Sequence, residues 1–363
     1  TTSLDVTVSA EILTELTRLC SERDMGLLLI SHDLAMIGEY CDRIAVMYQG
    51  KMVEMGDVKS ILYHPQHEYT KSLLNAALHL QAVESDPGDS IPREGPLLKV
   101  ENLKQYFSLE ANLIQQLFSK TKTIEIKAVD NISFNLYPGE ILGLVGESGC
   151  GKSTLSRTIL QLLKPTSGTV EFLGQDLTTL STSAMRSQRR ELQMVFQDPH
   201  ACLNPLMTVG ESIADPLLIH KLATPTEAKQ QVMTMLEKVG LTPTAEYCRR
   251  YPKELSGGQQ QRVAIARALI TNPKLVICDE PVSMLDATVQ TQVLELMLAL
   301  KAEFDLTYLF ITHDLWVARF FCDRIAVMNS GQIVEIDTTE QIFTQPQHPY
   351  TQKLLAAAPL LAK

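Results

Sequence analysis

A stretch of nine residues near the middle of the chain has the composition of a phosphate-binding loop. It consists of Gly146, Glu147, Ser148, Gly149, Cys150, Gly151, Lys152, Ser153 and Thr154. An apolar run over residues 141–145 precedes it and a helical pattern over residues 155–163 follows, which predicts a strand, a loop and a helix in that order. The glycines let backbone N–H groups converge on phosphate oxygens, and the helix N-terminus adds a favourable dipole. We expect Lys152 to reach the β- and γ-phosphates of a nucleoside triphosphate and Ser153 to bind Mg²⁺.

Two adjacent carboxylates follow a second apolar run. Residues 274–278 have the pattern of a strand in a buried parallel sheet, and Asp279 and Glu280 come directly after it. We expect these carboxylates at the phosphate end of the sheet. Asp279 would hold Mg²⁺, directly or through water, and Glu280 would polarise the water that attacks the γ-phosphate.

A second anion site is predicted between these two elements. Ser256 precedes two glycines, Gly257 and Gly258, then Gln259 and a helical pattern over residues 260–270. Ser256 is interpreted as the N-cap of that helix, and the glycines leave backbone N–H groups bare for an anion.

Together, the phosphate loop, the 256–259 segment and the Asp279–Glu280 strand resemble the nucleotide-binding domain of an ABC ATPase. The resemblance implies an α/β fold with a P-loop NTPase core, a helical subdomain carrying the signature at residues 256–259, and an antiparallel β-subdomain. In that family the signature caps the γ-phosphate of ATP held by a partner domain. The resemblance therefore implies a head-to-tail dimer of two ABC domains, with ATP and Mg²⁺ as cofactors.

The same resemblance assigns roles to other residues. Gln197 resembles the glutamine that couples Mg²⁺ and water to the membrane partner, and His313 resembles the switch histidine that contacts the γ-phosphate. Asp286 matches the loop that communicates across the dimer. An aromatic residue that stacks on adenine is expected on the first strand, where both Tyr106 and Phe107 fit. The sequence does not decide between these two rings, and ordinary strand packing is the alternative for both.

The chain also contains an internal repeat. Residues 1–80 align without a gap with residues 282–361, roughly four in ten positions are identical, and Cys41–Met47 recurs letter for letter as Cys322–Met328. The first copy starts after the counterpart of the catalytic carboxylates and without Met, so we interpret the sequence as a fragment of a longer tandem protein. The predicted domains are the C-terminal part of a first ABC ATPase domain (1–82), a linker (83–96), a complete domain (97–340) and a C-terminal extension (341–363).

Local patterns predict further elements. Residues 108–127 have the pattern of an amphipathic insertion, expected as a hairpin or short helix, before a strand that begins near Val129. Residues 204–250 have the pattern of a set of helices, which is the size of the signature-bearing subdomain in the family.

Each copy ends in a related segment, residues 64–70 and residues 345–351, in which a proline-stopped turn leads into a short apolar helix. His64 and His67 could bind a metal, but a structural turn is favoured because the second copy has Gln345 in place of His64. The tails resemble the C-terminal extension of ATPases that serve oligopeptide, dipeptide and nickel importers. Two such domains in one chain resemble tandem peptide-import ATPases.

This resemblance implies an ATP-hydrolysing subunit that energises an ABC importer for peptides or peptide-like compounds. Its implied partners are integral-membrane permease subunits and, indirectly, a periplasmic or extracellular substrate-binding protein. The implied location is peripheral, on the cytoplasmic face of the bacterial inner membrane. The particular substrate is not determined by the sequence.

Composition argues against several other classes. The net charge of −10 disfavours a nucleic-acid partner, and the seven cysteines are scattered in the manner of reduced cytosolic thiols. No apolar stretch approaches the roughly 18 residues needed to span a bilayer. A chromosome-maintenance ATPase is excluded because Lys152 and Ser256 are too close for its long heptad segment. A soluble tandem ABC ATPase that acts in translation would have a long charged linker, not the short acidic one of this chain. The sequence leaves open the alternative of a catalytically silent binding fragment.

Overall fold

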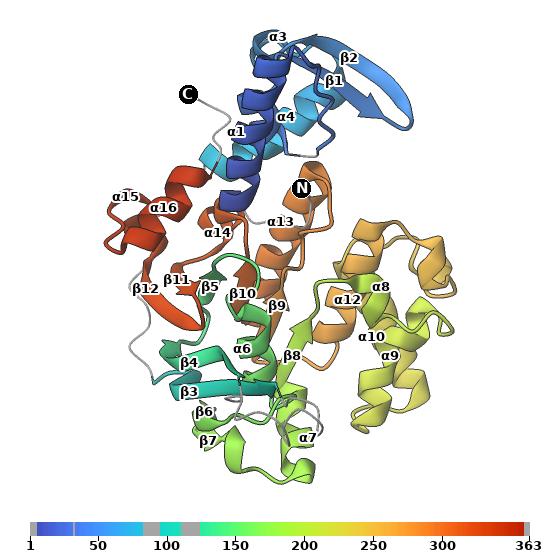
Figure 1. The fold of residues 1–363 in the computed structure, drawn as a ribbon. Helices are drawn as coiled ribbons and strands as arrows, with labels where there is room; N and C mark the ends of the chain where they lie inside the picture. The colour runs from blue at the N-terminus through green and yellow to red at the C-terminus, as the bar shows by residue number, and fades with distance from the viewer. Residues whose placement is uncertain (1–5, 32, 83–94, 110–123, 359–363) are drawn as a thin grey trace, which may run out of the picture.

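The computed structural model describes residues 6–31, 33–82, 95–109 and 124–358, and a six-stranded sheet lies at its centre (Figure 1). The order is β12-β11-β5-β10-β9-β8, and neighbouring strands are parallel except β11 and β12. The strands are β5 (Ile141–Val145), β8 (Leu192–Val195), β9 (Leu275–Asp279), β10 (Thr307–Thr312), β11 (Arg324–Asn329) and β12 (Gln332–Thr338). Every residue of β5, β9 and β10 is buried, which explains their unbroken apolar runs.

The two faces of this sheet pack into different cores. Ile141 and Val145 of β5 join a cluster with α13 (Ala287–Phe304) and α14 (Leu315–Phe321). Leu142 and Leu144 instead join a cluster with α6 (Lys152–Ile159), because successive side chains of a strand point to opposite faces.

A second sheet covers the α6 side and is entirely antiparallel, in the order β4-β3-β6-β7. Its strands are β3 (Leu98–Leu109), β4 (Ile124–Leu136), β6 (Ser167–Phe172) and β7 (Gln175–Asp176). The strand predicted to begin near Val129 begins earlier, at Ile124, because pairing with β3 extends it. The predicted hairpin or short helix of the insertion falls largely on residues 110–123, outside the described residues.

A lobe of helices projects from the edge of the main sheet at β8, drawn in yellow and light orange in Figure 1. It contains α8 (Pro199–Cys202), α9 (Val209–Ile219), α10 (Pro225–Lys238), α11 (Thr244–Tyr247), a 3₁₀ turn (Pro252–Glu254) and α12 (Gly257–Leu269). Thr208 and Thr224 form capping boxes with Glu211 and Glu227 at the starts of α9 and α10. The helices predicted over residues 204–250 are therefore present.

The remaining helices after residue 124 flank the two sheets. They are a 3₁₀ turn (Leu177–Thr179), α7 (Thr182–Glu191), α15 (Thr339–Thr344) and α16 (Pro349–Ala357). No helix among the described residues is long and apolar enough to cross a bilayer.

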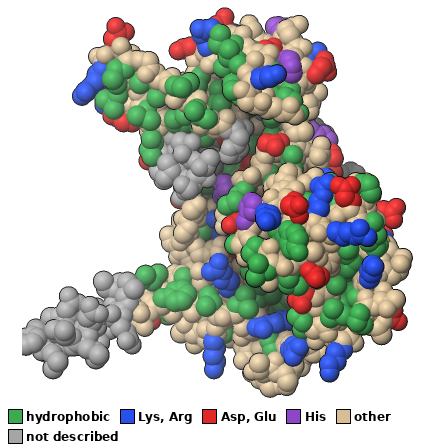
Figure 2. Space-filling view, turned by 90° about the vertical axis from the view of Figure 1, so that its right-hand side faces the viewer, with side chains coloured by type: hydrophobic (Ala, Val, Ile, Leu, Met, Phe, Trp, Pro, Cys, Tyr) green, Lys and Arg blue, Asp and Glu red, His purple; other side chains and the backbone are tan. Residues whose placement is uncertain are grey.

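The first copy reproduces six of the last seven elements of the chain at matching repeat positions. It contains α1 (Val6–Arg23), α2 (Leu34–Tyr40), β1 (Arg43–Tyr48), β2 (Lys51–Asp57), α3 (Val58–Tyr63) and α4 (Glu68–Ala82). The counterpart of β10 is missing: residues 25–31 contain no strand, and Leu28 and Ile30 are 87% and 83% exposed, whereas their repeat partners Leu309 and Ile311 are buried. A strand needs neighbours for its backbone hydrogen bonds, and β10 has β5 and β9. In Figure 2 the first copy forms the upper lobe, with hydrophobic side chains on its surface.

The two copies contact each other reciprocally. Helix α4 packs on α13 and α14, and α1 packs on α16. Since α1 and α13 are repeat partners, as are α4 and α16, one kind of contact is made twice, which gives the copies a pseudo-two-fold relation. Leu80 of α4 is 5% exposed and joins the main core, while His79–Glu295 and Glu11–Lys353 form ion-pair contacts of 3.7 Å at the surface.

Candidate active site

The predicted phosphate loop joins β5 to α6, and its three glycines have backbone conformations that side chains rarely adopt. Gly146 and Gly151 have φ values of 155° and 109°. A Cβ atom would lie 2.2 Å from the carbonyl oxygen of Met328 at Gly146, and 2.0 Å from that of Ala128 at Gly151. Glycine is therefore required at both positions for the loop to pass this close to neighbouring backbone.

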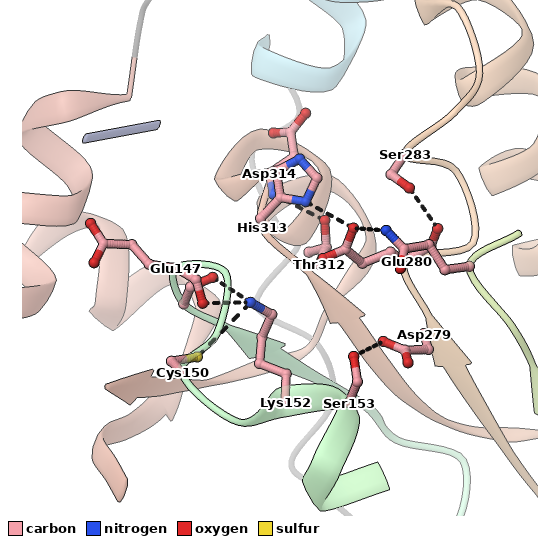
Figure 3. Close-up of polar contacts among 12 residues, drawn as sticks. Glu147, Cys150, Lys152, Ser153, Asp279, Glu280, Ser283, Thr312, His313 and Asp314 are labelled. Atoms are coloured by element: carbon pink, nitrogen blue, oxygen red, sulfur yellow. Dashed lines mark hydrogen bonds and ion pairs between the residues drawn. The ribbon is translucent and has the colours of Figure 1, made fainter. Parts of the chain in front are cut away.

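Lys152 is the first residue of α6 and is 5% exposed. Its Nζ donates to the carbonyl oxygens of Gly146, at 2.6 Å, and Glu147, at 3.0 Å, and lies 3.9 Å from Sγ of Cys150 (Figure 3). The loop thus curls around the ammonium group, which carries a positive charge at the helix N-terminus. A positive charge and a helix N-terminus together favour a phosphate group.

The next residue links the phosphate loop to the carboxylate strand. Ser153 Oγ donates to Oδ1 of Asp279 at 3.1 Å, which brings together two oxygen ligands of the kind that Mg²⁺ prefers. Asp279 is 3% exposed at the end of β9. Burial raises the pKa of the Asp279 carboxyl, the hydrogen bond from Ser153 lowers it in part, and the adjacent Glu280 charge raises it further.

Two predicted residues, Gln197 and His313, converge on Glu280. Its Oε2 accepts a hydrogen bond from Nε2 of Gln197 at 3.0 Å and lies 3.1 Å from Nδ1 of His313 (Figure 3). The hydrogen bond to Glu280 raises the pKa of His313 above its usual value, although desolvation opposes the shift. The backbone of Glu280 is left-handed, with φ at 49°, and its N–H donates to Ile311 of β10 at 2.9 Å. Such backbone strain in a non-glycine residue is common at functional sites.

The signature segment has the predicted N-cap but lies away from this cluster. Ser256 Oγ accepts from the N–H of Gln259, and Oε1 of Gln259 accepts from the N–H of Ser256, which forms a capping box. Ser256 and Gly257 are exposed, while Gly258 packs so tightly that a Cβ would lie 2.4 Å from Val289. Figure 1 shows α12 well apart from α6. The structure therefore does not bring the signature to the phosphate loop of the same copy.

The other predicted residues lie at the N-cap of α13 and on β3. Asp286 caps α13 by accepting from the N–H of Val289 at 3.1 Å. Tyr106 donates through its hydroxyl to Asp130, and Lys127 Nζ lies 5.3 Å from the centre of its ring. Phe107, the next residue on β3, is 38% exposed.

One contact at the phosphate loop was not predicted. The hydroxyl oxygen of Tyr350, at the start of α16, accepts a hydrogen bond from the N–H of Glu147 at 3.3 Å. The available signal was the tail motif, which repeats Tyr350 as Tyr69, but nothing in the pattern indicates which distant element a tail tyrosine contacts. In the first tail, Nδ1 of His67 accepts a hydrogen bond from the N–H of Tyr69 at 3.1 Å. This contact is the one expected of a structural turn.

Comparisons with known proteins agree with this architecture. Residues 129–283 match the ABC transporter family, and residues 53–105 and 334–363 match the C-terminal region of oligopeptide/dipeptide transporters. The chain is 44% identical over 381 residues to a protein from Pectobacterium atrosepticum named glutathione import ATP-binding protein GsiA. It is also 44% identical over 384 residues to GsiA of Escherichia coli K12. Each match covers 99% of this chain, which spans 60% of the length of these relatives.

Solved structures give the same family. The ATP-binding cassette MJ0796, in a dimeric post-hydrolysis state bound to ADP and Pi, matches with a TM-score of 0.58 and 30% identity, over 67% of this chain and 98% of that chain. The cbiO1 protein of Clostridium perfringens, part of the ABC transporter complex cbiONQ, matches with a TM-score of 0.58 and 27% identity, over 69% of this chain and 92% of that chain. The predicted fold class is thereby confirmed, and the chain belongs to the family of ABC transporter ATP-binding cassettes.

Proposed function

We propose that this chain binds ATP at the 146–154 loop and hydrolyses it to energise an ABC importer for peptides or peptide-like compounds. The observation that carries the proposal is the convergence of Lys152, Ser153, Asp279, Gln197 and His313 around one edge of the sheet, with Glu280 at its centre. Phosphoryl transfer requires a cation for the phosphates, oxygen ligands for Mg²⁺ and an oriented acceptor for the water proton. Each requirement is met by a different member of this set.

The residues present suit a magnesium ion. Ser153 and Asp279 supply a hydroxyl and a carboxylate oxygen 3.1 Å apart. Gln197 follows β8, the strand next to β9, and donates a hydrogen bond to Glu280. All three side chains offer hard oxygen ligands. When bound with ATP, Mg²⁺ would neutralise charge on the β- and γ-phosphates.

Glu280 would act as the acceptor for the proton of the attacking water. Gln197 and His313 both contact Oε2 of its carboxylate, which limits its rotation before substrate binds. His313, whose pKa is raised by that contact, would offer an N–H group to the γ-phosphate. Positioning of this kind supplies much of the rate enhancement in phosphoryl transfer.

Phe107 is the better candidate for the adenine platform. Tyr106 already has its hydroxyl held by Asp130 and the ammonium of Lys127 over its ring, whereas the Phe107 ring is partly exposed. Base stacking needs an open aromatic face.

The active unit would be a head-to-tail pair of cassettes. Ser256 and Gly257 are exposed at the start of α12, away from Lys152, so they would complete a site only on a partner cassette. The reciprocal packing of α4 on α13 and of α1 on α16 supports a two-fold arrangement of the copies. Asp286, at the start of α13, would lie in the loop that meets the partner.

Peptide import is supported by the tail and by the relatives. Both tails match the oligopeptide/dipeptide transporter C-terminal region, and the relatives named above are glutathione importers by name. We infer permease subunits as partners, docking near Gln197, a substrate-binding protein that acts through them, and a peripheral position at the cytoplasmic face of the membrane. The division at residues 82, 96 and 340 remains part of this proposal.

Phosphate release from MgATP by the purified chain, measured across protein concentration, tests the proposal. A rate per chain that rises with concentration is expected, because the signature must come from another cassette. ATP binding without turnover at any concentration would favour a catalytically silent fragment. Failure to bind ATP at all would contradict the proposal.

A further inference from the structure

The peptide group between Gly146 and Glu147 is held from both ends. Its carbonyl oxygen, on Gly146, accepts from Lys152 Nζ at 2.6 Å. Its N–H, on Glu147, donates to the hydroxyl oxygen of Tyr350 at 3.3 Å. One peptide plane therefore connects the ammonium group of Lys152 to a tyrosine that lies 203 residues after Glu147 in the chain.

The position of Tyr350 is fixed by its own turn. Glu335 of β12 accepts from the N–H groups of Gln347 and His348, at 2.7 and 3.0 Å. His348 Nδ1 then accepts from the N–H of Tyr350 at 3.1 Å and caps α16, with Pro349 in the first turn. The tyrosine ring packs against the main core. A side chain anchored at both its backbone and its ring is suited to hold a loop in place.

The protonation state of the Tyr350 hydroxyl agrees with its role as a hydrogen-bond acceptor. Burial raises the pKa of Tyr350 to about 12, and the charge of the Glu147 carboxylate contributes to the shift. The group is therefore a neutral hydroxyl near pH 7, able to accept from the N–H of Glu147.

We propose that Tyr350 is a positioning residue of the ATP site, which fixes the Gly146–Glu147 peptide and thereby the position of Lys152. The inference rests on the proposed binding of ATP at this loop. Without the hydroxyl, the peptide loses one of its two restraints, and its carbonyl would hold the ammonium group in a less defined place. The effect should fall on contacts to the β- and γ-phosphates, because these are the groups that Lys152 would reach.

The repeat supplies a matched control. The first tail has the same anchors: Glu54 accepts from the N–H groups of Gln66 and His67, and His67 Nδ1 accepts from the N–H of Tyr69. Tyr69, however, stacks on Tyr48 with ring centres 4.2 Å apart. Replacing Tyr69 by phenylalanine therefore removes the same atom from the same motif in the first copy, where the ring lies against Tyr48.

The test compares the wild-type chain with Tyr350→Phe and Tyr69→Phe by calorimetric titration with ATP and with AMP, which lacks β- and γ-phosphates. We expect Tyr350→Phe to raise the Kd for ATP about three- to tenfold, the effect of one lost hydrogen bond. Its Kd for AMP should be unchanged, and Tyr69→Phe should bind both nucleotides like the wild type. Thermal unfolding without nucleotide reports whether each variant is folded.

Three results would overturn the inference while leaving ATP binding intact. They are an unchanged Kd for ATP in Tyr350→Phe, an equal loss for ATP and AMP, and an equal loss in Tyr69→Phe. A wild-type chain that binds no ATP would instead contradict the proposed function, and this inference with it.

Discussion

His313 and Gln197 converge on a single oxygen atom, Oε2 of Glu280, at 3.1 and 3.0 Å. The histidine follows β10 and the glutamine follows β8, so β9, which ends beside Glu280, lies between their two strands in the sheet. Because the carboxyl ends of parallel strands share one edge, three strands present one reactive group each to the same place. This relation predicts that the three side chains act together.

Lys152→Ala should abolish nucleotide binding. The substitution removes the buried cation that faces the phosphates and leaves the carbonyl of Gly146 without its donor, so an affinity loss of at least about 100-fold is expected. Calorimetric titration with ATP measures it. Lys164→Ala, at an exposed position after α6, is the control and should bind normally. Unchanged affinity in Lys152→Ala would remove this loop from nucleotide binding.

Ser256→Asp should block hydrolysis and leave ATP binding to the phosphate loop intact. Aspartate preserves the N-cap of α12, so the helix should stay folded, but its charge would repel the γ-phosphate of ATP on the partner cassette. Ser256→Asn is the neutral control, since asparagine is an equally good N-cap. Phosphate release and ATP titration together check the outcome. Equal turnover in the two variants would argue that the signature does not face a phosphate.

Phe107→Ala should weaken ATP and ADP binding about tenfold or more, because stacking of a base on an aromatic ring contributes about 1–3 kcal/mol. Tyr106→Phe removes only the hydroxyl that contacts Asp130 and should leave affinity nearly unchanged. Fluorescent-nucleotide displacement measures both. The opposite ranking, with Tyr106→Ala more damaging than Phe107→Ala, would assign the adenine platform to Tyr106.

Glu335→Gln should reduce the dependence of stability on pH at the acid end. Although burial favours its neutral form, hydrogen bonds from the N–H groups of Gln347 and His348 hold the pKa of Glu335 below its usual value. A lowered pKa means that this stabilisation is present above about pH 4.5 and is lost as the pH falls through the lowered value.

Thermal unfolding between pH 7 and pH 3 measures the effect. At pH 7 the variant should melt about 2–4 °C lower than the wild type, and the two curves should converge toward pH 3. Glu340→Gln, an exposed residue in the first turn of α15, is the control. A difference that persists at pH 3 would show that the carboxylate charge is not the cause.

Much of the site could be predicted because its chemistry is local in sequence. The glycines of the phosphate loop, the N-cap at Ser256 and the buried strand before Asp279 each depend on a few consecutive residues. The convergence on Glu280 followed from the family resemblance, since spacing alone places no two of these strands side by side.

Other features depend on long-range pairing and could not be predicted. The left-handed backbone of Glu280 is fixed by its hydrogen bond to Ile311, and the Tyr350 contact joins the tail to a loop far earlier in the chain. Residues 25–31 have an apolar pattern like that of β10 but contain no strand, because β5 and β9 pair with β10 and not with this segment. Sequence pattern reports the preference of a segment, and pairing partners decide its structure.

The central claim is that Glu280 accepts the proton of the attacking water. Phosphate release from saturating MgATP by wild-type and Glu280→Gln chains tests it most directly, with ATP titration to show that both bind. The expected result is equal ATP affinity and a turnover at least about 100-fold lower in Glu280→Gln, the usual contribution of a positioned general base. Wild-type turnover in Glu280→Gln would contradict the account.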